Sequence, residues 1–88
     1  MSTSNEKFIN GALHGCPHIV IEALEDGADV NYRDSSALVY AIRNHDLELV
    51  KFLFKMGSNI PDKAHEESRK DINIKLLLER LQKLSLVD

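Results

Sequence analysis

The chain has 88 residues, a formal net charge of −3, 43% hydrophobic residues and 28% charged residues. This length predicts one domain, and the hydrophobic share is too high for an intrinsically disordered chain of such small net charge. No apolar run approaches the roughly 18 residues that a membrane-spanning helix needs. The first ten residues lack the cationic and apolar regions of a secretory signal. Cys16 is the single cysteine, so an intrachain disulfide is excluded and a reducing, cytoplasmic location is expected.

Short apolar segments with helical periodicity predict an all-α fold, because glycines and prolines separate them and no strand-like alternation persists. We expect the first helix over about residues 5–13, after a capping box at residues 3–6. The second helix should begin at Pro17, which suits a first helical position, and should end before Gly27.

The second half of the chain predicts four more helices, the first of them with Ser35 or Ser36 as its N-cap. The next should begin after Asp46, whose carboxylate can accept from free amides of the first turn. Two last helices are expected over about residues 63–69 and 71–84.

An internal repeat appears when residue i is aligned with residue i+30. The turn at residues 27–30, Gly-Ala-Asp-Val, then matches residues 57–60, Gly-Ser-Asn-Ile, and the apolar pair at 19–20 matches that at 49–50. A helix–turn–helix unit repeated at this spacing must stack on its neighbour to bury its apolar face. The repeat therefore predicts a short α-solenoid of stacked helix–turn–helix pairs.

At these residues the chain resembles the ankyrin-repeat family. Residues 19–31, IVIEALEDGADVN, are similar to the family's second helix and its Gly-Ala-Asp-x-Asn turn, and residues 47–57, LELVKFLFKMG, repeat that pattern. Residues 36–42, SALVYAI, take the place of the family's Thr-Pro-Leu-His-x-Ala-Ala. The spacing of 30 is shorter than the family's 33 or so, so the finger loop between repeats should be short.

The resemblance implies one ankyrin-like domain over residues 1–88. Its first repeat would be residues 5–34, its second residues 35–61, and a degenerate C-terminal capping repeat would follow at residues 62–88.

A cluster of candidate ligands, His14, Cys16 and His18, lies on a predicted turn. Its spacing differs from that of common zinc sites, and no fourth ligand is nearby in the sequence. Cys16 at a helix N-terminus is also a candidate nucleophile with a histidine base, but no oxyanion-hole motif or orienting partner is evident. We therefore expect a protein that is not an enzyme and that has no metal or cofactor.

The resemblance also implies protein binding through the finger tips and the exposed side of the first helix of each pair. Tyrosine and arginine are the residues that most often dominate binding energy; for Tyr32, the alternative is that it packs over the shortened loop. The candidate partner-binding residues are Leu13, His14, Tyr32, Arg33, Asp34, Ser35, Tyr40, Arg43 and Asn44.

The charge distribution bears on the kind of partner. Residues 1–31 contain five acidic residues against Lys7 alone, so they form either an ordinary solvated face or a surface that steers a basic partner. Such a module would act as an inhibitor or adaptor, for example a viral or bacterial accessory protein acting on a host factor in the host cytoplasm.

The alternative is a small helix–turn–helix regulator that binds DNA. Residues 61–88 hold six acids and six bases, which disfavours nucleic acid as the partner.

The last predicted helix has two apolar strips. Ile74, Leu77, Leu78, Leu81 and Leu84 form the strip expected to pack on the fourth helix. Ile72, Leu76 and Val87 point the other way, although a capping repeat should have a polar outer face. The second strip predicts a homodimer through this helix; the alternatives are a lone exposed leucine or a C-terminal tail that folds back over the strip.

Overall fold

A computed structural model of the chain describes residues 3–86, which form six helices and no strand. The helices are α1 (Thr3–Leu13), α2 (Pro17–Glu25), α3 (Tyr32–Arg43), α4 (Leu47–Lys55), α5 (Asp62–Ser68) and α6 (Ile72–Leu86). The predicted all-α fold is therefore confirmed. Over the described residues, no helix combines the length and the apolar character needed to cross a bilayer.

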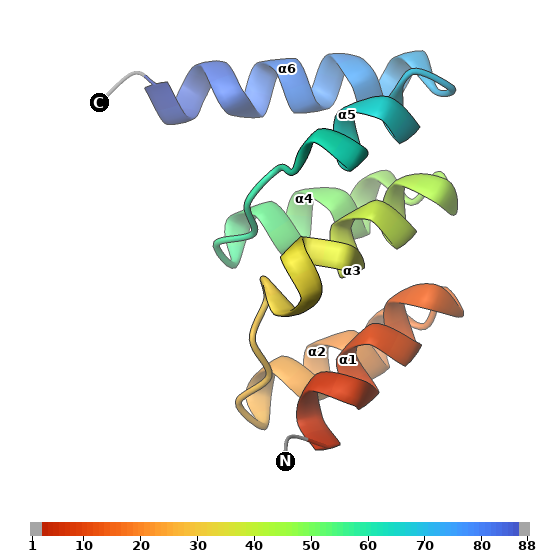
Figure 1. The fold of residues 1–88 in the computed structure, drawn as a ribbon, viewed down its shortest axis with the longest axis vertical. Coiled ribbons are helices and arrows are strands. Elements are labelled where there is room, and N and C mark those ends of the chain that lie inside the picture. Colours follow the sequence, from red (N-terminus) through yellow and green to blue (C-terminus); the bar gives the residue numbers. More distant parts are fainter. Residues whose placement is uncertain (1–2, 87–88) are drawn as a thin grey trace.

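The helices form three pairs that are stacked in chain order, with α1 and α2 at one end and α5 and α6 at the other (Figure 1). Within each pair the two helices pack on each other. Between pairs, α1 packs against α3, α3 against α5, and α4 against α6. The central helix α3 therefore packs against three helices, α1, α4 and α5, and its remaining surface is exposed.

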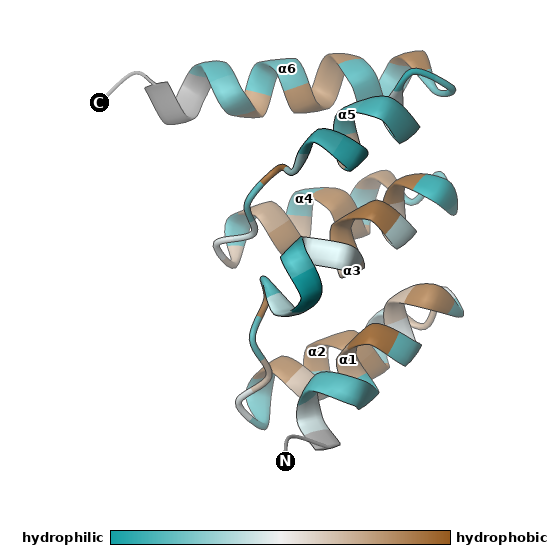
Figure 2. Cartoon of the chain, viewed as in Figure 1, coloured by the Kyte–Doolittle hydropathy of each residue, from teal (hydrophilic) through white to brown (hydrophobic). Residues whose placement is uncertain are grey.

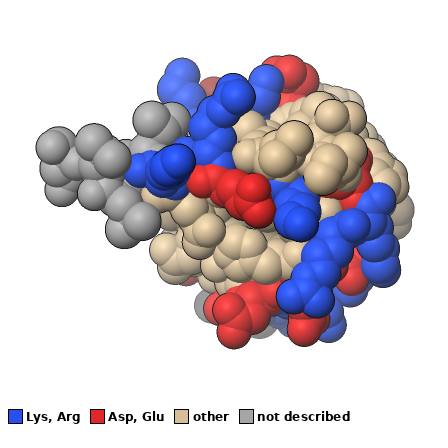
Figure 3. Space-filling model, turned by 90° about the horizontal axis from the view of Figure 1, so that it is seen from above, with Lys and Arg blue, Asp and Glu red and all other residues tan. Residues whose placement is uncertain are grey.

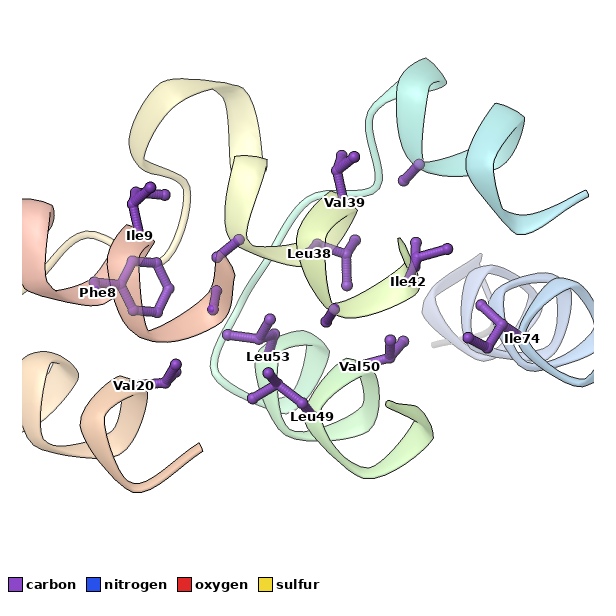
Figure 4. Close-up of a cluster of buried hydrophobic side chains, with 14 of the residues drawn as sticks. Phe8, Ile9, Val20, Leu38, Val39, Ile42, Leu49, Val50, Leu53 and Ile74 are labelled. Atoms are coloured by element: carbon purple, nitrogen blue, oxygen red, sulfur yellow. The ribbon is translucent and has the colours of Figure 1, made fainter. Parts of the chain in front are cut away.

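One hydrophobic core runs through the three pairs. The apolar faces of the helices turn toward one another (Figure 2), and the close-up in Figure 4 shows their side chains meeting between the pairs. Phe8, Leu38 and Leu53 are completely buried, and burial of each such side chain contributes about 1.5–3 kcal/mol. Helix α6 contributes the buried Ile74 and Leu78, as its inner strip predicted.

Local sequence signals determine several helix ends as predicted. Pro17 is the first residue of α2, where its missing N–H removes no helical hydrogen bond. Asp46 is the N-cap of α4, and its carboxylate accepts from the backbone N–H of Leu49 at 3.1 Å. Gly27 and Gly57 follow the ends of α2 and α4 with φ near +100°, which glycine adopts without strain.

The start of α3 differs from the prediction, since neither Ser35 nor Ser36 is an N-cap. Arg33, Asp34 and Ser35 form one left-handed turn, with φ of 54°, 56° and 59°, before the right-handed helix continues. The Ser35 hydroxyl donates to the side-chain oxygen of Asn31 at 2.6 Å, and the Ser36 hydroxyl donates to the carbonyl of Arg33. Both hydroxyls therefore stabilise the left-handed turn.

The other bounds differ by one or two residues. Helix α1 includes Thr3, so the helix begins two residues earlier than predicted. Helix α5 begins at Asp62 and ends at Ser68, and α6 spans Ile72–Leu86. Asp71 precedes α6 and accepts from the backbone N–H of Asn73 at 3.0 Å, so it acts as a cap outside the helix.

Asparagine side chains connect successive pairs. The side-chain oxygen of Asn31 accepts from the backbone N–H of Asn59 at 2.7 Å, and its amide donates to the carbonyl of Gly57 at 3.3 Å. One side chain thus joins the turn after α2 to the turn after α4. At the other end of the helices, the Asn44 amide donates to the carbonyl of Ala12 at 3.1 Å.

Candidate functional site

Four of the residues predicted for partner binding, Arg33, Asp34, Tyr40 and Arg43, line a shallow depression on α3, which we call the α3 groove. Its volume is about 240 Å³. Helix α3 contributes most of the lining and α5 contributes one lysine. The lining residues are Arg33, Asp34, Ser36, Val39, Tyr40, Arg43 and Lys63.

Two arginines of this region stack on tyrosines. The guanidinium carbon of Arg43 is 5.9 Å from the ring centroid of Tyr40, and that of Arg33 is 5.4 Å from the ring of Tyr32. Such cation–π contacts contribute about 0.5–1 kcal/mol at exposed sites. They limit the motion of both arginines, so less side-chain entropy is lost when a ligand binds.

The left-handed turn determines the position of Arg33. A residue other than glycine in this conformation costs about 1–2 kcal/mol, so a turn of three such residues needs support from its surroundings. The hydrogen bond from Ser35 to Asn31 supplies part of that support, and Tyr32 packs against the edge of the core. Tyr32 is therefore held partly buried beside the turn.

Positive charge predominates in the α3 groove. The Nε of Arg43 donates to a carboxylate oxygen of Glu67 at 3.0 Å, and this hydrogen bond lowers the pKa of Glu67 from its usual range. Among the described residues, the ion pairs do not involve Arg33 or Lys63. Asp34 is the groove's one acidic residue, so two cations remain for an incoming ligand.

The structure does not bring all the predicted residues to the α3 groove. Ser35 is only 1% exposed and its hydroxyl is bonded to Asn31, so the prediction that Ser35 contacts a partner is wrong. Asn44 lies at the far end of α3, where its amide also approaches the carbonyl of Leu13 at 3.5 Å. Leu13 and His14 are exposed at that same end. The predicted set therefore divides between the groove and a separate turn region.

Sequence reasoning missed Lys63, which comes from α5 and reaches the groove only because α5 packs on α3. The 30-residue repeat contained the available signal, since it aligns Lys63 with Arg33. Residues that occupy equivalent positions in stacked units lie on the same face of the stack.

The histidine- and cysteine-rich turn is not assembled into a metal site. In the described part of the chain, no three His, Cys, Asp or Glu side chains are close enough to hold a metal ion. The Sγ of Cys16 lies 3.8 Å from the carbonyl of His14, and the His14 ring nitrogen lies 2.8 Å from the carbonyl of Asn10. These contacts are local to the turn between α1 and α2.

A histidine–aspartate pair lies elsewhere, between the turn after α3 and the start of α6. The Nδ1 of His45 is 2.8 Å from a carboxylate oxygen of Asp71, and this hydrogen bond lowers the pKa of Asp71. Asp71 also accepts from backbone amides of α6. The pair therefore connects the second helix pair to the third.

Comparison with known proteins found no family model, curated protein or solved structure that matches this chain significantly. The resemblance to ankyrin repeats accordingly stays a prediction. The α3 groove is the feature on which a functional proposal rests.

Proposed function

We propose that this protein is a protein-binding module and that its partner binds in the α3 groove. The observation that supports this most is the pairing of Arg43 with Tyr40 in the groove lining and of Arg33 with the partly buried Tyr32 beside it. Tyrosine and arginine are enriched among residues that dominate binding energy. Binding at this surface would block or bridge the partner, which is the action of an inhibitor or adaptor.

The charge of the groove favours an acidic segment of the partner. In the described part of the chain, Arg33 and Lys63 form no ion pair, so both can donate to a ligand. Asp34 adds one acceptor that can select the orientation of the ligand. The acidic residues of positions 1–31, which predicted a basic partner surface, come from α1, α2 and the turn after α2. They lie outside the groove lining, so they do not oppose an acidic ligand there.

We further infer that the helix pairs are ankyrin-like units. Support comes from the matching turns at residues 27–30 and 57–60, each with a glycine at φ near +100°. Asn31 bridges these two turns, which indicates that they are stacked at equivalent positions. Repeat proteins of this kind present an extended surface made of neighbouring units, and the α3 groove has that character because α3 and α5 both line it.

The test is affinity capture with the full chain and a double variant of the groove, Arg33→Ala with Tyr40→Ala. A matched control is Lys55→Ala with Met56→Ala, because these two exposed residues, one basic and one apolar, lie at the end of α4 outside the groove. Hot-spot residues contribute about 2 kcal/mol or more, so the groove variant should weaken binding about 30-fold or more. The control variant should retain the captured protein. Equal capture by all three chains would refute binding in the groove.

A further inference from the structure

An apolar depression opens at the α1–α2 end of the stack. It is lined by Lys7, Asn10, Gly11, His14, Cys16 and Ile19, has a volume of about 590 Å³, and is called the N-terminal groove below. Helix α1 turns Phe8 and Ala12 into the core. Because successive residues are separated by 100° around a helix, Lys7, Asn10 and His14 lie on the side away from α3.

Gly11 shapes the floor of the N-terminal groove. A Cβ atom at this position would lie 3.0 Å from Cγ2 of Ile19, so a larger residue would require the Ile19 side chain to shift by a few tenths of an ångström. Ile19 is exposed in part along the seam between the two helices. The result is an apolar concave surface where a further helix pair would stack if the repeat continued.

The opposite end of the stack has exposed apolar side chains. Ile72 is 61% exposed and Leu76 is 56% exposed on the outer side of α6. Leu76 also lines a depression of about 220 Å³ with Leu47 and Leu77 of α4 and α6. We call Ile72, Leu76, Leu77 and Leu47 the C-terminal surface. Figure 3 looks onto this end, where uncharged surface lies among both basic and acidic side chains.

Helix α6 and the α1–α2 pair differ in the sign of their net charge. Helix α6 has Lys75, Arg80 and Lys83 against Glu79 alone, so its net charge is positive. At the other end, a single base, Lys7, lies between two acids of the α2 region, 3.2 Å from Glu22 and 4.0 Å from Asp26. Two copies of α6 placed against each other would bring like charges together. Lys7 is the one charged residue in the lining of the N-terminal groove, and it is paired with Glu22 and Asp26. The C-terminal surface placed on this groove brings the cations of α6 near these two carboxylates, which lie beside the groove.

We propose that the occupant of the N-terminal groove is the C-terminal surface of a second copy of this chain. This contact is head-to-tail, so each copy keeps one free groove and one free surface, and the assembly grows beyond a dimer. The molecule measures 34 × 29 × 20 Å, and its longest axis runs along the stack (Figure 1). Each end of the stack is therefore about 29 Å by 20 Å, and its area is smaller than the roughly 800 Å² per partner of a standard stable interface. Association should therefore be weak and depend on concentration. It leaves the α3 groove of every copy open.

The test is sedimentation of the full chain from micromolar to millimolar concentration, with two interface variants. Leu76→Gln removes the main apolar contact of the C-terminal surface, and Asn10→Arg places a bulky cation in the N-terminal groove. Both positions are exposed, so thermal unfolding should match the wild type. Met56→Gln is the matched control, since Met56 is an apolar residue with 48% exposure in the middle helix pair.

We expect the mean mass of the wild type and of Met56→Gln to rise past that of a dimer, while each interface variant associates at least tenfold more weakly. An equal mixture of the two variants should form a dimer that does not grow, because Leu76→Gln retains the N-terminal groove and Asn10→Arg retains the C-terminal surface. A wild type that remains monomeric throughout would overturn the proposal. A mixture of the two variants that remains monomeric would also overturn it. A closed wild-type dimer that Leu76→Gln abolishes but Asn10→Arg leaves intact would overturn it as well, because that result would indicate two-fold pairing of α6.

Discussion

Replacement of the half-buried Asn31 by alanine should destabilise the protein more than replacement of any exposed polar side chain in its turns. The side-chain oxygen of Asn31 accepts from Asn59 N–H at 2.7 Å and from the Ser35 hydroxyl at 2.6 Å, and its amide donates to Gly57. Alanine removes all three hydrogen bonds at once. The change therefore loosens both the left-handed turn of α3 and the contact between successive helix pairs.

The expected loss follows from the burial of the groups that remain. Ser35 is 1% exposed, so its unpaired hydroxyl costs about 1–3 kcal/mol. Asn59 is exposed and can bond to water, so its lost bond costs about 0.5–1.5 kcal/mol. These two losses total about 1.5–4.5 kcal/mol, which is a large part of the roughly 4–13 kcal/mol typical of a domain this size. The total corresponds to a decrease in Tm of about 10–25 °C.

Urea unfolding of four chains measures this effect: wild type, Asn31→Ala, Ser35→Ala and the double variant. Because Ser35→Ala removes the donor that would be left unpaired, Asn31→Ala should cost about 1 kcal/mol less in that background. Asn31→Asp retains the acceptor oxygens and should be milder than Asn31→Ala. An Asn31→Ala protein within about 0.5 kcal/mol of the wild type would refute the assigned role of this side chain.

Three further predictions concern the cap, the core and the ion pairs. Asp46→Ala should lower the free energy of unfolding by about 1 kcal/mol, and Asp46→Asn by less, because the amide oxygen can still accept from the first turn of α4. Leu53→Ala should cost about 2–5 kcal/mol in urea unfolding, because Leu53 is completely buried. The pKa of Glu67 is lowered from 4.5, chiefly by its hydrogen bond to Arg43, and that of Asp71 from 3.8, chiefly by its hydrogen bond to His45. A carboxyl group whose pKa is lower in the folded state than in the unfolded state stabilises the protein at any pH above its unfolded-state pKa. This stabilisation is lost as the pH falls and the carboxylate is protonated, so stability should decrease below about pH 4.5. Arg43→Gln should make that decrease smaller, and an unchanged pH profile would contradict the assignment.

The helix ends that the sequence predicts well depend on neighbouring residues. Pro17, Gly27, Asp46 and Gly57 act within one turn of the chain, through a missing donor, a positive φ or a side-chain acceptor. Their effect does not depend on distant contacts, so local rules suffice.

The start of α3 could not be predicted in this way. Serine before an apolar helix normally indicates an N-cap, yet Ser35 is buried in a left-handed turn whose stability depends on Asn31. Asn31 is itself held by residues 57 and 59 of the next turn. A conformation supported by contacts across 28 residues of sequence overrides the local preference.

The candidate site was predictable to the extent that it lies on one helix. Tyr40 and Arg43 are separated by three residues, so they share a face of α3 by helical geometry alone. Lys63 belongs to another pair, and its place in the groove depends on how α5 packs on α3. The stacking of α1 on α3 likewise determines that Asn44, Leu13 and His14 lie together at the far end of α3, outside the groove.

The prediction that the second strip of α6 drives self-association stays a prediction. Ile72 and Leu76 are exposed as it requires, and Val87 lies outside the described residues. The structure adds the N-terminal groove as a second surface of matching character, which the sequence pattern of α6 alone does not indicate.

The most direct test of the central claim is an amide-resonance map of the isotopically labelled protein, titrated with the partner that affinity capture identifies. Binding in the α3 groove predicts the largest shift changes at Arg33, Tyr40, Arg43 and Lys63, with small changes in α2. Saturating changes confined to the α1–α2 pair or to α6, with these four residues unaffected, would contradict the claim that the α3 groove is the binding site.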